Sequence, residues 1–177
     1  MKAKIKPLEI ERLTTERLML IPFTIQICEN LMQENFSDLH KLGLKRGKSW
    51  PDGDLIEILP KIIDKLSPIG VPSGFESWMI IKKNTLEVIG DIGFKGFNLD
   101  ENNIDLGYGI IIEERRKGYT DEAAKALIKW AFSNEFVKEI TARCLIDNLG
   151  SVNLLKKLNF QEIKRNEGMI YWSVMRS

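Results

Sequence analysis

The fold is decided by the stretch Gly107–Ala131, GYGIIIEERRKGYTDEAAKALIKWA, in which a strand leads through a charged turn into a helix. Branched apolar residues at period two predict the strand over residues 104–112. Apolar residues at helical spacing, with no breaker among them, predict the helix over Thr120–Phe132. The first N–H groups of a helix lack partners within it and lie at the positive end of its dipole. The turn around Gly118 therefore indicates a site for an anion such as phosphate, although many such junctions bind nothing.

The remaining elements follow from the same periodicities. Strands are expected over residues 13–23, 78–81, 87–94, 138–146, 160–164 and 169–175, and helices from Thr24 to before Ser37, over 55–66, and from Asn148 or Ser151 to Leu158. Pro60 predicts a kink or a break in the second helix. Gly107 and Gly109 predict a bulge or a close backbone approach in the strand 104–112. The order β-α-α-β-β-β-α-β-α-β-β is that of an α+β fold with a mixed sheet.

Length and composition favour one globular domain over residues 1–177. A chain of 177 residues with 44% hydrophobic and 29% charged residues has the composition of a folded protein, which excludes a disordered tail. No apolar run approaches the ~18 residues of a membrane span, and the charged N-terminus lacks an apolar signal segment. We therefore expect a cytoplasmic protein that contacts no membrane. Cys28, Cys144 and His40 fit no metal-ligand spacing, so no metal site is expected.

The charge balance argues against nucleic acid as a partner. The chain has 26 Lys and Arg residues against 25 Asp and Glu residues, and the net charge of +1 creates no strong overall field. One local basic run consists of Lys41, Lys45, Arg46 and Lys48. We expect this run to be a solvated loop, with recognition of a substrate, contact with a phosphate or nucleic-acid binding as the alternatives.

Residues 115–120, Arg-Arg-Lys-Gly-Tyr-Thr, resemble the acyl-CoA signature of the GNAT family of N-acetyltransferases, Gln/Arg-x-x-Gly-x-Gly/Ala. Residues 105–109 are similar to the acidic-x-Gly-Tyr strand of the branch that includes ribosomal-protein alanine acetyltransferases, and residues 122–132 are similar to that branch's helix. The segments 148–151 and 155–160 resemble the family's Asn-x-x-Ser and lysine-leucine-glycine-phenylalanine motifs. The motifs fall in the family's order, and the order of elements matches over nearly the whole chain.

The chain departs from the family's pattern at four positions. Thr120 stands at the small sixth position of the signature, where we expect it to cap the helix, and Arg116 stands where glycine is common. Asp121 adds a negative charge beside the phosphate site, which the basic residues of the turn offset. Asn159 replaces the glycine before the closing phenylalanine, and Asn accepts the same left-handed helix end.

The resemblance implies a GNAT-like twisted sheet, mixed but mostly antiparallel, flanked by helices. It implies an N-acetyltransferase that moves the acetyl group of acetyl-CoA to a primary amine by direct attack in a ternary complex. The acceptor would be a protein N-terminus or a small-molecule amine, recognised by residues 33–74. The enzyme would use no metal and would be a monomer or a homodimer. A non-catalytic acyl-CoA-binding sensor on the same fold is the alternative.

The resemblance also implies which residues contact the cofactor. A bulge would separate the strand that carries Ile110 and Ile112 from the next strand, so that their backbone groups pair with the pantetheine and polarise the thioester carbonyl. The pyrophosphate would lie on the turn 115–120, Asn148 would contact the pantetheine, and Ser151 would contact the cofactor or donate a proton. The residues expected at the cofactor are Ile110, Ile111, Ile112, Arg115, Arg116, Lys117, Gly118, Tyr119, Thr120, Asn148 and Ser151.

Polar residues of the strands are the candidates for proton transfer. Asp105 is favoured as the base for the amine over two other strand carboxylates, Asp91 and Glu76. A desolvated carboxylate has a pKa raised toward neutrality, which suits a general base. Tyr108 or Tyr171 would donate a proton to the leaving thiolate, with a role in the core as the alternative for each tyrosine.

Overall fold

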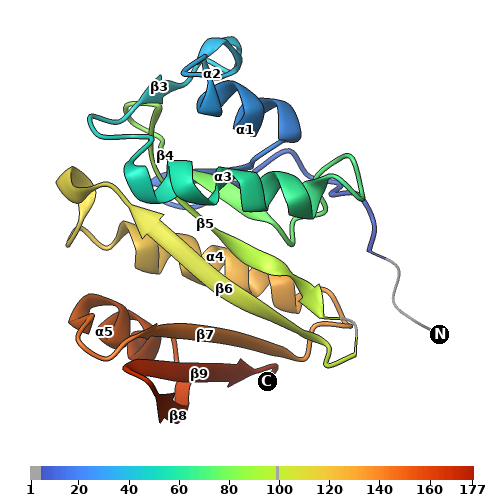
Figure 1. Cartoon of the computed structure of the whole chain (residues 1–177), viewed down its shortest axis with the longest axis vertical. Helices are drawn as coiled ribbons and strands as arrows, with labels where there is room; N and C mark the ends of the chain where they lie inside the picture. The colour runs from blue at the N-terminus through green and yellow to red at the C-terminus, as the bar shows by residue number, and fades with distance from the viewer. Residues whose placement is uncertain (1–4, 99) are drawn as a thin grey trace.

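The computed structural model describes residues 5–98 and 100–177, and over these residues it forms a nine-stranded sheet with helices on both faces (Figure 1). The strands are β1 (Leu13–Thr14), β2 (Leu18–Pro22), β3 (Lys45–Arg46), β4 (Ser77–Lys82), β5 (Glu87–Asn98), β6 (Asn103–Ile110), β7 (Glu139–Leu145), β8 (Gln161–Asn166) and β9 (Met169–Met175). The helices are α1 (Ile25–Met32), α2 (Ser37–Lys41), α3 (Gly53–Leu66), α4 (Tyr119–Phe132) and α5 (Leu149–Lys157), with a 3₁₀ turn η1 over Ile112–Glu114.

The sheet has the mixed, mostly antiparallel pairing that was expected. Its order is β1-β2-β4-β5-β6-β7-β9-β8, and β3 pairs with β5 outside this path. The parallel pairs are β6 with β7 and β3 with β5. Parallel neighbours need a crossover connection, and α4 is that connection between β6 and β7. Within the described residues, no helix is long and apolar enough to cross a membrane.

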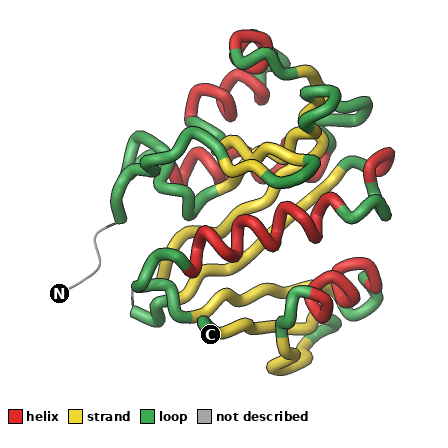
Figure 2. Tube along the Cα trace, turned by 180° about the vertical axis from the view of Figure 1, so that it is seen from behind, coloured by secondary structure: helices red, strands yellow, loops and turns green. Residues whose placement is uncertain are grey.

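The two faces of the sheet are covered by different helices. Figure 1 shows α1, α2 and α3 in front of the upper strands, and Figure 2 shows α4 across the opposite face. The buried side of α4 consists of Ala123, Ala124, Leu127 and Ala131, so the helix backbone lies close to the sheet. α3 buries Leu55, Leu59, Ile62 and Leu66 on its own face.

The parallel ladder between β6 and β7 is short. It runs from Asn103 opposite Glu139 to Leu106 opposite Ala142 and then ends. Beyond it, β6 stays paired with β5 as far as Ile110, while β7 stays paired with β9. The two strands therefore separate in the middle of the sheet, and Figure 1 shows them diverging toward α5.

The predicted bulge lies in a different strand. The pairing of β6 with β5 is regular from Gly107 to Ile110, and the register shifts instead in β5, between Phe94 and Phe97. The predicted close backbone approach is not found at Gly107 or Gly109: a Cβ would meet no described heavy atom within 4 Å at Gly107 and only Asp91 Oδ1, at 3.4 Å, at Gly109. The tight position is instead Gly90, where a Cβ would lie 2.4 Å from the carbonyl oxygen of Gly109. The separation of β6 from β7 thus begins without a bulge next to the gap.

Two local expectations are wrong, and a third is narrowed. The strand predicted over 13–23 is two strands, since the Thr15 N–H donates to the Leu18 carbonyl at 2.9 Å and turns the chain. The loop predicted to carry the basic run contains α2 and β3, and β3 is held against β5 by the Lys45 N–H, which donates to the Leu86 carbonyl at 2.9 Å. Of the two outcomes expected at Pro60, a break is excluded, because α3 is one helix from Gly53 to Leu66.

Candidate functional site

The gap between β6 and β7 exposes backbone groups of β6. The Ile111 N–H donates to the Ile89 carbonyl at 2.9 Å. Since residues of an antiparallel pair alternate in the direction of their N–H and C=O groups, those of Tyr108 and Ile110 point the other way, toward β7. Both residues lie beyond Leu106, where the ladder with β7 ends. They therefore line the gap, as the sequence predicted for Ile110.

The three isoleucines predicted at the cofactor have different surroundings. The Ile110 carbonyl accepts a hydrogen bond from Arg115 Nε at 3.3 Å. Ile111 is 1% exposed and its N–H is used by β5, so its placement does not support the predicted cofactor contact. Ile112 is the first residue of η1 and is 69% exposed at the end of the gap.

The turn between η1 and α4 has the backbone of an anion site. Arg116 has φ +63° and Gly118 has φ +79°, both in the left-handed region. Gly118 is the N-cap of α4, so Thr120 lies inside the first turn and is not the cap that was expected. The first N–H groups of α4 thus face out of the turn. Arg115, Arg116 and Lys117 are exposed around it and supply positive charge.

Two ion-pair clusters hold this turn in place. Arg17 Nε lies 2.7 Å from Glu122 Oε2, and Arg17 Nη1 donates to the Lys117 carbonyl at 2.9 Å. Glu122 also accepts from the Thr15 hydroxyl at 2.6 Å and from the Arg17 N–H at 2.7 Å. Burial opposes ionisation of Glu122, but the hydrogen bonds from Thr15 and Arg17 outweigh it and lower the pKa of that carboxyl.

The second cluster lies on the other side of the turn. Glu114 pairs with Lys82 at 2.8 Å and with Lys117 at 3.1 Å. Burial again opposes the charge, yet these two lysines lower the pKa of Glu114. Residues from β4, η1 and the turn are therefore joined by charge-assisted contacts.

Asp121 is neutralised by lysines from two helices. Its Oδ2 lies 3.0 Å from Lys125 of α4 and 3.4 Å from Lys157 of α5. Its Oδ1 is buried and has no hydrogen-bond partner within the described residues. The charge that Asp121 brings to the anion site is thus offset locally, although by lysines and not by the arginines of the turn.

One side of the gap carries Tyr108 together with the start of α5. Burial raises the pKa of the Tyr108 phenol, and the nearby Ser151 side chain lowers it by less. Asn148 caps α5, because its side-chain oxygen accepts from the Ser151 N–H at 3.2 Å. This cap leaves the Nδ2 group of Asn148 as a donor. The structure thus brings together three of the predicted site residues.

Two carboxylates lie on the face of the sheet opposite Tyr108, one on β6 and one on the neighbouring strand β5. Asp105 accepts from the Thr141 hydroxyl at 2.8 Å and pairs with Lys95 at 3.0 Å. Asp91 is half-buried on β5, directly opposite Gly109 of β6. Burial raises the pKa of Asp91 to about 7, with a further contribution from the negative charges of two aspartates of the α3 N-terminal region.

Two other predicted candidates lie away from the gap. Glu76 is buried, and it accepts the Ser73 N–H at 2.8 Å and the Ser73 hydroxyl. Tyr171 lies on β9 opposite Arg143, with the Lys164 ammonium 4.8 Å from its ring centroid. β7 therefore stands between Tyr171 and the gap.

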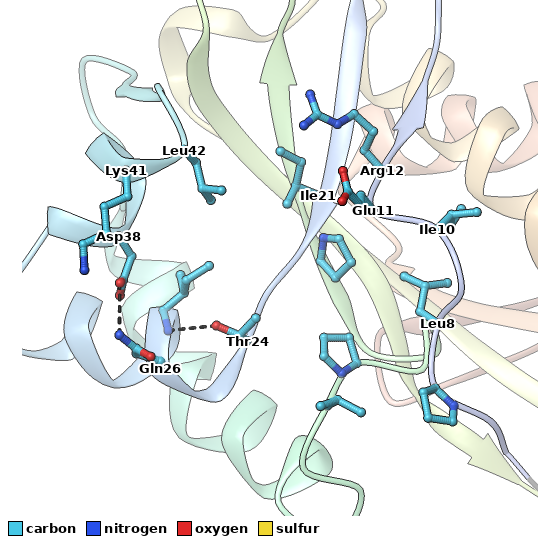
Figure 3. A pocket seen from close by; sticks show the side chains of 15 residues that line it. Leu8, Ile10, Glu11, Arg12, Ile21, Thr24, Gln26, Asp38, Lys41 and Leu42 are labelled. Atoms are coloured by element: carbon cyan, nitrogen blue, oxygen red, sulfur yellow. Dashed lines mark hydrogen bonds between the residues drawn. The ribbon is translucent and has the colours of Figure 1, made fainter.

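A separate cavity of about 720 Å³ lies between the segment 7–12, the end of β2 and the helices α1 and α2 (Figure 3). Leu8, Ile21 and Leu42 contribute to its mainly apolar wall. None of the residues predicted to contact the cofactor or to transfer protons lines it, so it is distinct from the gap. Five residues of the segment 33–74, which was predicted to recognise the acceptor, do line it: Asp38, Lys41, Leu42, Val71 and Pro72. No group of three or more His, Cys, Asp or Glu side chains in residues 5–98 and 100–177 is arranged to hold a metal ion.

Comparison with known proteins gives a family match and a relative of similar length. The acetyltransferase (GNAT) domain family matches residues 17–161 of this chain. The uncharacterized N-acetyltransferase YjdG of Bacillus subtilis (strain 168) is 40% identical over 149 residues, which are 84% of this chain and 88% of YjdG.

Two solved structures share the fold at low sequence identity. RimL, a ribosomal L7/L12 alpha-N-protein acetyltransferase in complex with coenzyme A, has a TM-score of 0.65 and 15% identity, over 93% of this chain and 98% of that chain. The microcin C7 self-immunity acetyltransferase MccE, in complex with acetyl-CoA and AMP, has a TM-score of 0.61 and 14% identity, over 91% of this chain and 93% of that chain. The predicted fold class is confirmed.

Proposed function

Because the chain belongs to the GNAT family of acetyltransferases, we propose that it transfers the acetyl group of acetyl-CoA to a primary amine by direct attack in a ternary complex. The observation that carries the proposal is the gap between β6 and β7, which opens beyond Leu106 and Ala142 toward the N-terminus of α4. An extended pantetheine arm fits such a gap as an added strand, since Tyr108 and Ile110 offer it backbone donors and acceptors.

The pyrophosphate of acetyl-CoA is proposed to bind at the turn 115–120. The left-handed residues Arg116 and Gly118 turn the N–H groups of the first turn of α4 outward, and the helix dipole favours an anion there. The exposed side chains of the turn add positive charge. Asn148, whose Oδ1 is occupied by its cap, would donate from Nδ2 to a pantetheine carbonyl.

Tyr108 is proposed to protonate the departing sulfur. Its raised pKa keeps the phenol protonated at neutral pH, and an acid must hold its proton until the thiolate forms. Ser151, whose side chain lowers the pKa of the nearby phenol, would orient it. The Ile110 N–H, which points into the gap, would polarise the thioester carbonyl and stabilise the oxyanion.

The acceptor is proposed to be the primary amine of a protein N-terminus or of a small molecule. RimL is by its name a ribosomal-protein N-terminal acetyltransferase, while MccE is a self-immunity acetyltransferase, and the two share this fold. Fold alone does not choose between such acceptors. The face of the gap opposite Tyr108 is the side from which the amine would arrive.

The test is acetyl transfer followed by release of free CoA thiol. The probes are hexapeptides that begin with Ala or Ser, spermidine and an aminoglycoside, with the N-acetylated Ala peptide as the control that lacks a free α-amine. We expect thiol release with at least one free amine and none with the blocked peptide. In the variant Tyr108→Phe, kcat should fall by about 10²-fold while the Kd for acetyl-CoA is unchanged. Tight acetyl-CoA binding without transfer to any probe would instead identify a sensor.

A further inference from the structure

A second residue lies one strand away from the gap, on the face of the sheet opposite Tyr108. Asp91 of β5 lies directly opposite Gly109 of β6. A Cβ at Gly109 would lie 3.4 Å from Asp91 Oδ1, so the carboxyl group covers the side-chain position that the glycine leaves empty. At Gly107, no described heavy atom comes within 4 Å of the corresponding position. Asp91 thus borders an open strip of backbone that leads to the gap.

Asp91 and Tyr108 lie on opposite faces of the sheet. Side chains alternate along a strand, and directly opposite residues on neighbouring strands share a face. Asp91 therefore shares the face of Gly109 and Gly107, whereas Tyr108 points to the face that carries α4 and Ser151. In the proposed function, the pantetheine lies in the gap and its sulfur receives a proton from Tyr108, which leaves the Asp91 face for the amine.

We propose that the Asp91 carboxylate accepts the proton that the acceptor ammonium must lose before it attacks the thioester. This inference rests on the proposed acetyl transfer and names a catalytic residue for it. The competing carboxylate, Asp105, is held by Lys95 at 3.0 Å and by the Thr141 hydroxyl at 2.8 Å. Both oxygens of Asp105 thus already have a partner in the sheet.

The surroundings of Asp91 support this role. The charged groups that face it from α3 and its cap are Asp52 and Asp54, and both are acidic. Asp52 is fixed, since its side chain accepts from the Leu55 N–H at 3.0 Å. The strand neighbours of Asp91, Met79 and Gly109, carry no charge. Burial and this repulsion favour uptake of a proton, and they place the pKa of Asp91 at about 7, close to that of an ideal base at neutral pH.

The proton balance of the reaction is complete with these groups. Asp91 takes the first proton from the ammonium ion, and the nitrogen lone pair attacks the thioester carbon to form the C–N bond. The C–S bond then breaks with its electron pair going to sulfur, which receives a proton from Tyr108. The nitrogen loses its second proton to water, Tyr108 regains one from water, and Asp91 releases its own. One proton is released for each amide formed.

The experiment compares Asp91→Asn with the matched variant Asp105→Asn, using acetyl-CoA and the probe amine that the wild-type protein acetylates best, from pH 5.5 to 9. In Asp91→Asn we expect kcat to fall by about 10²-fold or more, with the Kd for acetyl-CoA within about twofold of wild type. The kcat/KM of the wild-type protein should rise with pH through a pKa near 7. In Asp91→Asn, the pH profile of kcat/KM should show only the ionisation of the substrate amine, which lies near pH 8 for an α-amine. In Asp105→Asn, kcat/KM should still rise through a pKa near 7, as in the wild-type protein.

The inference is overturned if Asp91→Asn retains the wild-type kcat and its kcat/KM still rises through a pKa near 7. If the wild-type protein binds acetyl-CoA but acetylates no probe, the proposed function fails first, and Asp91 has no reaction to serve. Thermal unfolding provides a second readout. The pKa of Asp91 in the folded protein, about 7, is higher than the value near 3.9 in the unfolded chain, so the destabilisation is absent below about pH 4, grows as the pH rises and is complete above about pH 7. Asp91→Asn should therefore raise Tm at pH 8.5 and not at pH 4, and a variant that does not fold, or has a lower Tm at pH 8.5, contradicts the proposal.

Discussion

Arg17 and Glu122 are 105 positions apart in the chain, yet Nε of Arg17 lies 2.7 Å from Oε2 of Glu122. The guanidinium also reaches the Lys117 carbonyl at 2.9 Å and lies 4.4 Å from the ring centroid of Tyr119. The turn before β2 is thereby tied to the first turn of α4. This tie positions the backbone that is proposed to bind pyrophosphate.

Removal of the Arg17–Glu122 ion pair is predicted to weaken cofactor binding more than it slows catalysis. Glu122→Gln leaves Arg17 without its ionic partner, so the turn 115–118 becomes less well ordered. The KM for acetyl-CoA should rise about three- to tenfold with kcat changed by less than twofold, and Arg17→Ala should behave in the same way. Arg165→Ala, which removes the exposed pair with Glu162 on β8, is the control and should leave both constants unchanged. Equal KM values in Glu122→Gln and wild type would contradict the positioning role.

The same pair predicts a pH dependence of stability. The folded-state pKa of Glu122 is lowered, so its contribution is complete above the unfolded pKa near 4.3 and is lost as the pH falls through the folded value. Arg17 is 44% exposed, so the stabilisation is about 1–2 kcal/mol, which corresponds to a Tm difference of about 2–8 °C. Calorimetry should find that the Tm of the wild-type protein exceeds that of Glu122→Gln by this margin at pH 7, and that the difference in Tm shrinks below pH 4. A difference in Tm that stays constant from pH 7 to pH 2.5 would refute the lowered pKa of Glu122.

Gly118 and Gly168 form a matched pair for testing the phosphate turn. Their φ angles are +79° and +80°, so a Cβ strains the backbone equally at both. Either substitution by Ala should cost about 1 kcal/mol of stability. At Gly118 the Cβ would also lie 3.4 Å from Arg17 Nη2, whereas none of the described atoms lies within 4 Å at Gly168. Titration calorimetry should therefore show weaker acetyl-CoA binding in Gly118→Ala alone, and equal affinities in the two variants would remove the phosphate assignment.

The sequence was sufficient to predict the parts of the site that depend on local pattern. The helix α4 shows its apolar period without interruption, and Asn148 was one of two residues expected to open α5. The helix cap itself was assigned to Thr120, because its hydroxyl suits that position, but Gly118 takes it in the left-handed conformation. Ile111 was expected at the cofactor with Ile110 and Ile112, and the sequence did not reveal that its N–H pairs with the Ile89 carbonyl of β5.

The remaining features depend on contacts between distant segments. Neither the Arg17–Glu122 pair nor the neighbours of Asp91 has a signal at fixed spacing, since tertiary packing alone brings them together. Asp105 fitted the motif better than Asp91, and the sequence did not reveal that Lys95 and Thr141 bind it. The aspartates of the α3 N-terminal region, which raise the pKa of Asp91, lie nearly 40 positions away from it.

Asp121 allows a test of electrostatics at the cofactor site. Asp121→Asn removes a negative charge beside the turn and releases Lys125 and Lys157, which lie 3.0 and 3.4 Å from it. Acetyl-CoA affinity should rise by about two- to fivefold at low salt, and the gain should shrink at 0.5 M salt because the charges are screened. Asp100→Asn, in the distant turn before β6, is the control with the same change of charge. Unchanged or weaker binding in Asp121→Asn would show that the pairing with lysines is needed for the site.

The central claim is that the gap between β6 and β7, with the turn 115–120 at its end, binds acetyl-CoA. Calorimetric titration of the wild-type protein with acetyl-CoA, with CoA and ATP as comparison ligands, tests it most directly. The account predicts binding of one acetyl-CoA per chain at micromolar concentration, similar binding of CoA and none of ATP. Absence of acetyl-CoA binding, or equal binding of ATP, would contradict it.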